Sequence, residues 1–218
     1  MSLSHHISDE LLLAYEAGSL AEGWSLAVAT HLALCPACRR RARLAAEVGG
    51  AALETIETSP VSDAAFDRVM ARVAASPQPQ AAEKRPPPGA TPCLPEPLRS
   101  YAGGDVDRIA WKRLGGTALH LPIATGDGKT RARLLKIPAG APVPAHGHGG
   151  MELTVVLAGS LCDGDEVFRR GDIEEADEGI EHQPRAGPEG DCICLVVTDA
   201  PLRFKTWLAR LAQPFLRI

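Results

Sequence analysis

The sequence predicts two domains of different class, an all-α helical bundle over residues 1–75 and an all-β sandwich or barrel over residues 98–218. Before residue 75, apolar residues recur at helical spacing, whereas after residue 98 short alternating or β-branched runs lie between Gly, Pro and Asp. Between them, residues 76–97 hold eight prolines and almost no large apolar side chain. That composition is typical of an extended linker that leaves the orientation of the two domains free.

The N-terminal helices are placed by their capping residues. Ser8 is suited to cap a first helix, Ser19 and Glu22 form a capping box for a second, and Pro36 suits the first position of a third. Ser62 is placed to cap the last helix. Two helix faces are apolar and are expected either to pack within the bundle or to bind a partner. They consist of Leu11, Leu12 and Tyr15, and of Phe66, Val69, Met70 and Val73.

A first metal-binding pattern lies at the junction of the second and third helices. His31, Cys35 and Cys38 offer three soft ligands within about two helical turns, and Pro36 places Cys35 between two helices. One imidazole of the pair at residues 5–6 completes a closed His2Cys2 set, which predicts a structural zinc site. A redox pair or two buried small residues are the alternatives for this Cys-x-x-Cys spacing.

A second metal-binding pattern lies in the β-rich half, in runs that predict strands over 106–114, 117–123, 130–137, 153–157 and 191–198. His146 and His148 share one face of an extended segment, and Glu152 keeps the same parity. His182 is expected to approach from a neighbouring strand. Three imidazoles and one carboxylate suit Zn, Fe, Mn or Ni, and such a site can keep one position open.

Composition excludes several classes of function. Residues 1–75 carry six Arg against nine Asp or Glu, which disfavours direct nucleic-acid binding. No apolar run reaches 18 residues and the first thirty residues lack a signal-peptide core, so we expect no membrane span and a cytoplasmic protein.

The acidic run over residues 172–181 is expected to be a solvated turn and strand face.

The remaining cysteines are expected to be buried or inert. Cys192 and Cys194 lie on one face of a strand about 7 Å apart at Cα, which is too far for an unstrained disulfide. They are either buried small hydrophobes or a redox sensor near the second metal. Cys93 falls in the linker.

The motifs of the second half resemble those of the cupins. The first motif is Gly140-x5-His146-x-His148-x3-Glu152-x6-Gly159, and the second is Gly171-x5-Asp177-x-Gly179-x2-His182. The second motif departs from the family pattern, with Asp177 in place of proline and Ala186 in place of asparagine. The resemblance covers residues 98–218 and implies a jelly-roll β-barrel that holds a metal through His146, His148, Glu152 and His182.

The whole chain resembles the ChrR-type anti-sigma factors, which join a zinc-binding anti-sigma domain to a cupin-like domain. The likeness includes the His-His-x-Ser-Asp opening and the run Asp191-Cys192-Ile193-Cys194-Leu195. It implies His6 as the fourth zinc ligand, with His5 the alternative. It also implies a 1:1 complex with an extracytoplasmic-function sigma factor, released when the cupin-like domain responds to singlet oxygen or peroxides.

Two functions from different classes are therefore compared. The favoured one is a non-enzymatic anti-sigma factor, in which zinc folds the helical surface that covers the sigma factor. The alternative is a metal-dependent cupin enzyme, a dioxygenase or an isomerase, with the zinc domain as a scaffold. The linker-joined zinc domain and the altered second motif favour the regulator.

Overall fold

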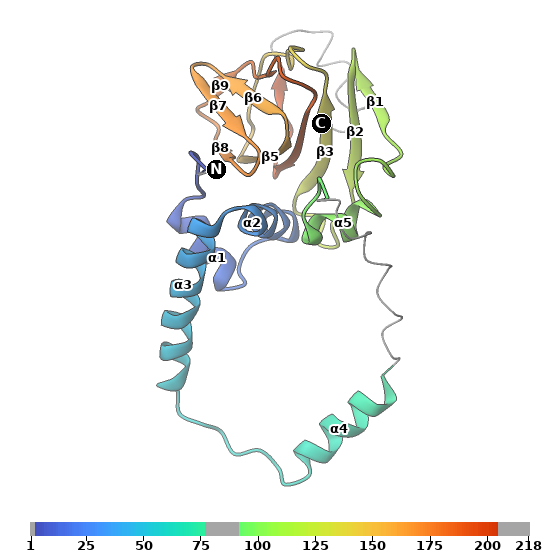
Figure 1. Ribbon diagram of the computed structural model, residues 1–218. Coiled ribbons are helices and arrows are strands. Elements are labelled where there is room, and N and C mark those ends of the chain that lie inside the picture. The colour runs from blue at the N-terminus through green and yellow to red at the C-terminus, as the bar shows by residue number, and fades with distance from the viewer. Residues whose placement is uncertain (1–2, 77–91, 205–218) are drawn as a thin grey trace.

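The computed structural model describes residues 3–76 and 92–204, and Figure 1 shows helices followed by a β-barrel. This order confirms the predicted fold class. The helices are α1 (Asp9–Glu16), α2 (Glu22–Leu34), α3 (Pro36–Glu54), α4 (Ala65–Ala75) and α5 (Glu96–Ala102). Within the described residues, no helix has the length and apolar character needed to cross a membrane.

Two of the four predicted helix starts are confirmed, and Ser62 is wrong as a cap because α4 begins at Ala65 without a side-chain cap. The Ser8 hydroxyl accepts a hydrogen bond from the Leu11 N–H at 3.4 Å, and Pro36 is the first residue of α3. The capping box is wrong, because α2 begins at Glu22 without a side-chain cap. The Glu22 carboxylate instead accepts hydrogen bonds from the Tyr101 hydroxyl and the Gly126 N–H. Contacts with distant segments therefore replace the local cap.

The strands form one large sheet and two small ones, and every pair is antiparallel. The large sheet has the order β1-β2-β3-β11-β5-β8, and the small sheets have the orders β10-β6-β7 and β12-β4-β9. The strands are β1 (Lys112–Gly115), β2 (Ala118–Ile123), β3 (Arg131–Ile137), β4 (His146–Gly147), β5 (Glu152–Ala158), β6 (Ser160–Asp163), β7 (Glu166–Arg169), β8 (Ile173–Ala176), β9 (Glu181–His182), β10 (Arg185–Ala186), β11 (Cys192–Thr198) and β12 (Arg203–Phe204).

The large sheet is covered on both faces. On β5, Leu153, Val155 and Leu157 belong to the core shared with the helices, whereas Val156 belongs to a second core inside the barrel. A strand that is buried on both faces is expected to be apolar throughout rather than alternating. This explains why the run at residues 153–157 is continuous.

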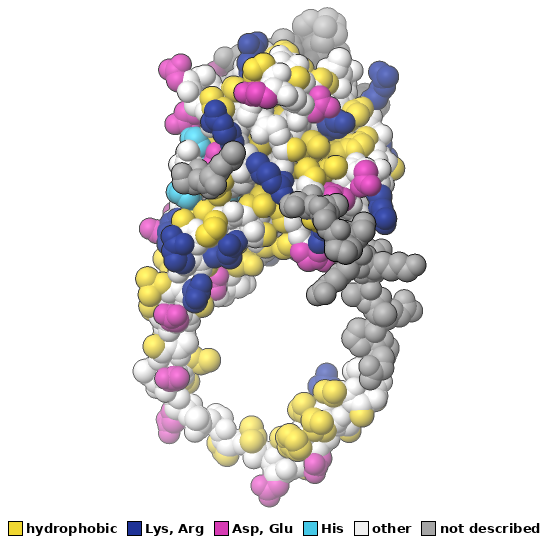
Figure 2. Space-filling model, viewed as in Figure 1, with side chains coloured by type: hydrophobic (Ala, Val, Ile, Leu, Met, Phe, Trp, Pro, Cys, Tyr) yellow, Lys and Arg dark blue, Asp and Glu magenta, His cyan; other side chains and the backbone are white. Residues whose placement is uncertain are grey.

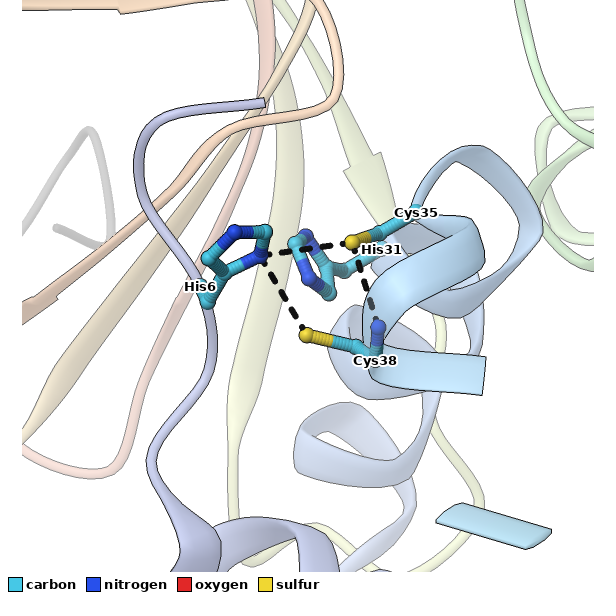
Figure 3. Close-up of side chains that lie close together, drawn as sticks. All are labelled: His6, His31, Cys35 and Cys38. Carbon is cyan, nitrogen blue, oxygen red and sulfur yellow. Dashed lines mark hydrogen bonds between the residues drawn. The ribbon is translucent and has the colours of Figure 1, made fainter. Parts of the chain in front are cut away.

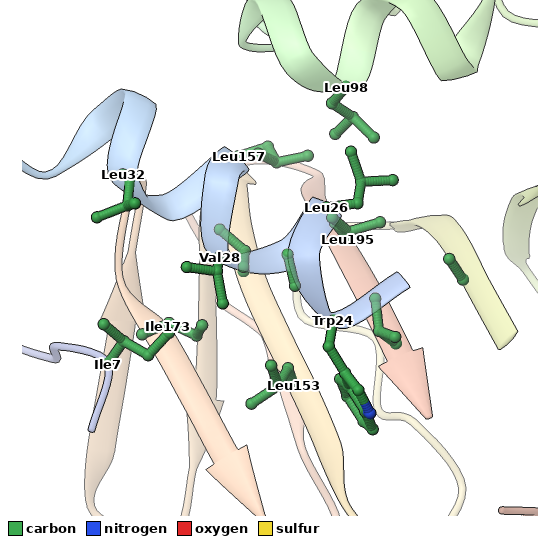
Figure 4. Close-up of a cluster of buried hydrophobic side chains, with 14 of the residues drawn as sticks. Ile7, Trp24, Leu26, Val28, Leu32, Leu98, Leu153, Leu157, Ile173 and Leu195 are labelled. Carbon is green, nitrogen blue, oxygen red and sulfur yellow. The ribbon is translucent and has the colours of Figure 1, made fainter. Parts of the chain in front are cut away.

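Helix α2 lies across the outer face of the large sheet. Figure 4 shows Val28 and Leu32 of α2 beside Leu153, Leu157 and Ile173 of the sheet. Helices α1 and α3 contact α2 and each other. Because a helix that contacts neighbours on several sides must be apolar on several sides, most of α2 is buried.

The predicted independence of the two domains is wrong. Residues from α1, α2 and α3 share one hydrophobic core with β3, β5, β8 and β11. The described end of the predicted linker also belongs to this core, since Leu94 is 1% exposed and α5 already begins at Glu96. The helical and β parts therefore have a fixed relative orientation. Their apolar faces cover each other, which composition alone did not reveal.

The first predicted strand is also too long. Residues 106–108 form a turn, residues 109–111 have no regular structure, and β1 begins only at Lys112. The Asp105 carboxylate accepts hydrogen bonds from the N–H groups of Cys93, Leu94 and Val106. This local network replaces the pairing that a strand would need.

The docking of α2 on the sheet depends on Gly23. A Cβ atom at this position would lie 2.2 Å from Thr130 Oγ1 and 3.1 Å from Val197 Cγ1. We expect Gly23→Ala to lower the free energy of unfolding by about 1–3 kcal/mol, because overpacking outweighs the gain in helix propensity. Gly49→Ala is the control, since no atom of the described residues lies within 4 Å of a Cβ added there, and it should be neutral or stabilising by up to about 1 kcal/mol. Urea unfolding measures both, and equal effects would contradict the close packing.

Helix α4 lies away from the rest of the molecule in Figure 1. None of its residues is buried. Phe66 is 72% exposed, and Val69, Met70 and Val73 are also exposed. Figure 2 shows hydrophobic side chains on the surface of α4 and along α3. Of the two alternatives for this apolar face, packing within the bundle is wrong for this structure.

Candidate metal centres

The N-terminal cluster joins the start of the chain to the junction of α2 and α3. His6, His31, Cys35 and Cys38 place one ligand atom each within 4.8 Å of the others, and Figure 3 shows their side chains converging. His31 lies in the last turn of α2, and Cys38 lies in the first turn of α3. Pro36 separates the helices because it cannot continue α2.

The distances in this cluster fit a tetrahedral metal ion. His6 Nδ1 lies 3.4 Å from Cys35 Sγ and 3.5 Å from Cys38 Sγ. In a tetrahedral zinc site, a ligand nitrogen and a ligand sulfur lie about 3.6 Å apart. His5 points elsewhere, with its ring 4.2 Å from the Phe168 ring and beside Asp172. Of the two neighbouring histidines, the structure therefore brings His6 to the cluster.

One nitrogen of His31 has no partner other than the cluster. His31 Nδ1 donates a hydrogen bond to the Gly171 carbonyl at 2.7 Å, and the buried Nε2 has no hydrogen-bond partner among the described residues. Burial lowers the pKa of His31 to about 4, so the ring is neutral at pH 7. A neutral imidazole whose far nitrogen donates to a carbonyl is the usual form of a metal-ligating histidine. The residues present therefore fit a metal ion.

Arg41 lies beside the thiols. Its guanidinium donates hydrogen bonds to Cys38 Sγ at 3.4 Å and to the Ile7 carbonyl at 3.0 Å, and it pairs with Asp9. Burial and the neighbouring Cys35 raise the pKa of the Cys38 thiol, and the Arg41 charge acts in the opposite direction. A metal cation would also lower the pKa of the Cys38 thiol and would favour the thiolate.

The second cluster lies inside the β-barrel. His146, His148, Glu152 and His182 are all buried, and their ligand atoms lie within 4.8 Å of one another. Strand β4 pairs with β9 so that His146 lies opposite His182. His182 Nε2 lies 3.0 Å from His148 Nε2 and 3.1 Å from His146 Nε2. Nitrogen ligands around one metal ion have about this spacing.

Hydrogen bonds on the outer side fix two of these imidazoles. His146 Nδ1 donates to the Pro144 carbonyl at 2.8 Å, and His182 Nδ1 donates to Asp163 Oδ2 at 2.7 Å. The two Nε2 atoms therefore face each other with lone pairs, an arrangement that a cation stabilises. Asp163 is a supporting residue that the sequence reading missed, because it follows no recognisable ligand spacing.

Two carboxyl groups in this region are shielded from solvent: Glu152 is buried, and the Glu174 side chain is 11% exposed. Burial raises the pKa of Glu152 to about 7, and burial together with the neighbouring Asp163 raises the pKa of Glu174 to about 8. The expectation that the acidic run is solvated is therefore wrong for Glu174, and also for Asp172, which is 2% exposed. The side chains of Asp172 and Glu174 make tertiary contacts that the local composition does not show.

A cavity of about 540 Å³ opens beside the barrel cluster. Its wall is largely apolar, and the polar side chains that line it include His146 and Glu152. The apolar part includes Leu114, Leu135, Ile137, Val143, Leu161, Val196 and Phe204. A mostly apolar pocket with a few polar groups is the usual form of a small-molecule site.

Cys192 and Cys194 are both buried in β11, and Cys194 lines this cavity. A hydrogen bond with Cys192 and burial raise the pKa of the Cys194 thiol well above its ordinary value. A neutral thiol reacts slowly with oxidants. The redox role of the two residues therefore stays a prediction. Cys93 is half-buried, and its thiol donates to the Leu157 carbonyl.

Of the two apolar faces predicted to bind a partner, one is buried within the molecule and the other is exposed. Leu11 and Leu12 are buried in the shared core, and Tyr15 packs against it. The first face is therefore used within the molecule and is wrong as a partner surface. The stripe at Phe66, Val69, Met70 and Val73 is exposed and stays available.

A helical His2Cys2 cluster packed on a barrel with a His3Glu cluster defines a cupin-type protein with an added candidate metal centre. Residues 100–201 match the family described as the ChrR cupin-like domain. The chain is 48% identical over 220 residues to the anti-sigma-E factor ChrR of Cereibacter sphaeroides, and the match covers the whole of both. The chain therefore belongs to the ChrR family, as its resemblance predicted.

A solved structure of a ChrR protein shows the same relationship. The fold matches a chain in the crystal structure of Rhodobacter sphaeroides SigE in complex with the anti-sigma ChrR, with a TM-score of 0.79 and 42% identity. That match covers 91% of this chain and 100% of the other. An RmlC-like cupin protein of Ralstonia eutropha JMP134 is 20% identical, with a TM-score of 0.42 over 48% of this chain and 71% of the other.

Proposed function

We propose that this chain is an anti-sigma factor that holds an extracytoplasmic-function sigma factor inactive in a 1:1 complex. The full-length similarity to ChrR, which is seen in complex with SigE, carries the proposal. The exposed apolar stripe on α4 supports it, because an unpartnered amphipathic helix suits a groove on another protein. The role is regulatory rather than enzymatic, and its place is the cytoplasm, where the sigma factor meets RNA polymerase.

Two metal ions are part of this proposal. Zinc is the ion for His6, His31, Cys35 and Cys38, because two thiols and two imidazoles in a closed tetrahedral set suit zinc. Zinc or another divalent transition metal suits His146, His148, Glu152 and His182. The first ion would act through folding, and the second would add a reactive centre beside the cavity.

Co-expression with candidate sigma factors tests the binding proposal. The chain and a sigma factor should co-purify at equal stoichiometry, with no RNA polymerase activity from the sigma-dependent promoter until the anti-sigma factor is removed. Light scattering after gel filtration gives the mass of the complex. Purification of the chain without any sigma factor, from a host that expresses all candidates, would contradict the proposal.

We further propose that the cupin-like part makes the complex respond to singlet oxygen or peroxides. The barrel cluster and its cavity support this, since they combine candidate metal ligands with room for a small molecule. Release of the sigma factor requires that the signal changes the free energy of the bound state relative to the free state.

The variant His146→Ala tests the response. It should lower the metal content from about two ions per chain to about one, and it should keep the sigma factor silent under an oxidant that releases it from the wild type. Metal analysis and a sigma-dependent reporter measure the two effects. Asp165→Ala, at an exposed position, is the control and should behave as wild type. Normal induction with His146→Ala would place the sensor outside the barrel cluster.

A further inference from the structure

A three-residue turn between β7 and β8 contacts three separate segments of the chain. This junction turn consists of Arg170, Gly171 and Asp172. It binds the strap at residues 3–8 that carries His6, the end of α2 that carries His31, and the segment that enters α5. It therefore lies where the helical part meets the barrel.

Asp172 holds the strap through its backbone. Its Oδ1 accepts hydrogen bonds from the Ser4 N–H at 2.9 Å and the His5 N–H at 3.1 Å. Its Oδ2 accepts a third from the Arg169 N–H at 2.8 Å. Burial would raise the pKa of Asp172, but these three donors hold it below its ordinary value. The next residue along the strap is His6, so this clamp sets the position of a candidate ligand.

Gly171 holds the second imidazole. Its carbonyl accepts the hydrogen bond from His31 Nδ1 that leaves Nε2 aimed at the cluster. Its φ of +96° favours glycine, and a Cβ would lie 2.8 Å from Leu3 Cδ2 and 3.3 Å from Leu34 Cβ. The helical part can approach this closely only because the residue is glycine.

Further hydrogen bonds anchor the junction turn to the barrel. Arg170 donates to the carbonyls of Cys93 and Leu157, and the Gly171 N–H donates to the Val156 carbonyl at 2.8 Å. The Val156 N–H donates in turn to the Asp172 carbonyl at 3.1 Å. Val156 and Leu157 lie in β5, the strand whose first residue is Glu152 of the barrel cluster.

We propose that the junction turn positions two of the four ligands of the N-terminal metal centre, so that the barrel contributes to the affinity of that centre. The proposal rests on zinc binding at the centre, as proposed above. Residues that orient metal ligands through hydrogen bonds typically contribute about tenfold to a hundredfold to the metal affinity. Coupling between two binding sites is reciprocal. A ligand or metal ion in the barrel that alters the junction turn through β5 should therefore change the zinc affinity, and zinc binding should change the affinity of the barrel for that ligand by the same factor.

The test uses the full chain carrying His146→Ala, so that the N-terminal centre holds the zinc that is counted. Asp172→Ala in this background should weaken zinc binding about tenfold to a hundredfold in chelator competition. Asp172→Asn, which keeps one acceptor oxygen, should recover part of the loss. Binding of Co²⁺ gives a second readout, because its visible absorption reports the ligand geometry and should shift in Asp172→Ala.

A matched pair on the strap tests the same contact without altering the barrel. Ser4→Pro removes the N–H group that donates a hydrogen bond to Asp172. Ser4→Ala keeps this N–H group and changes only an exposed side chain. Ser4→Pro should weaken zinc binding relative to Ser4→Ala. The double variant with Asp172→Ala should be no weaker than Asp172→Ala alone, because both remove the same interaction.

Each outcome is decisive. Equal zinc affinity for Ser4→Pro and Ser4→Ala overturns the proposal, even if Asp172→Ala fails to fold. Wild-type affinity and an unchanged Co²⁺ spectrum in Asp172→Ala overturn it as well. Failure of the proposed zinc site gives a different result, because the chain with His146→Ala alone would then bind no zinc.

Discussion

Replacing Cys35 or Cys38 with serine is expected to remove one zinc ion per chain and to abolish sigma-factor binding. Each thiol lies in a cluster that ties the strap, α2 and α3 together. Binding free energy at a structural zinc site is folding free energy, with apparent values on the order of 10 kcal/mol for zinc-dependent domains. Helix α3 should detach first, because the strap and α2 are also held by the barrel.

Metal analysis and a pull-down with the sigma factor measure this prediction. Cys162→Ser is the control, because Cys162 is half-buried in β6 and outside both clusters. It should retain both metal ions and the partner. Full zinc content and sigma binding in Cys38→Ser would mean that the two thiols are a buried pair rather than ligands.

The double variant Phe66→Ala and Met70→Ala is expected to weaken sigma binding by about a hundredfold or more while the fold persists. Both side chains are exposed, so their removal should change the free energy of unfolding by less than about 0.5 kcal/mol. A large apolar side chain that fills a partner's groove typically contributes about 2 kcal/mol or more to binding. Loss of affinity without loss of stability is the signature of an interface.

Arg68→Ala is the matched control on α4. Arg68 lies on the side of the helix opposite the stripe and contacts the Ser62 hydroxyl. Its replacement should leave affinity within about twofold of wild type, since exposed surface positions contribute little. Titration calorimetry with the sigma factor and thermal melts of the free chain give the two quantities. Equal affinity for the double variant and for Arg68→Ala would remove α4 from the proposed interface.

The sequence by itself determined the fold class and predicted both candidate ligand sets, apart from the choice between His5 and His6. Cys35 and Cys38, like His146 and His148, lie within a few residues of each other, and local helix or strand geometry brings such neighbours together. The Ser8 cap and the Pro36 helix start were predicted for the same reason. The short strands β6, β7, β10 and β12 were not predicted, because their runs are too brief to show a period.

Only the tertiary structure decided how the two halves meet. The hydrogen bond from His31 to Gly171 spans 140 residues, and that from Ser4 to Asp172 spans 168. No local pattern reports contacts at such separations. The same limit explains why Leu11 and Leu12 resembled a partner surface but lie in the core. Composition identifies an apolar face, whereas the packing of distant segments decides whether the molecule itself or another protein covers it.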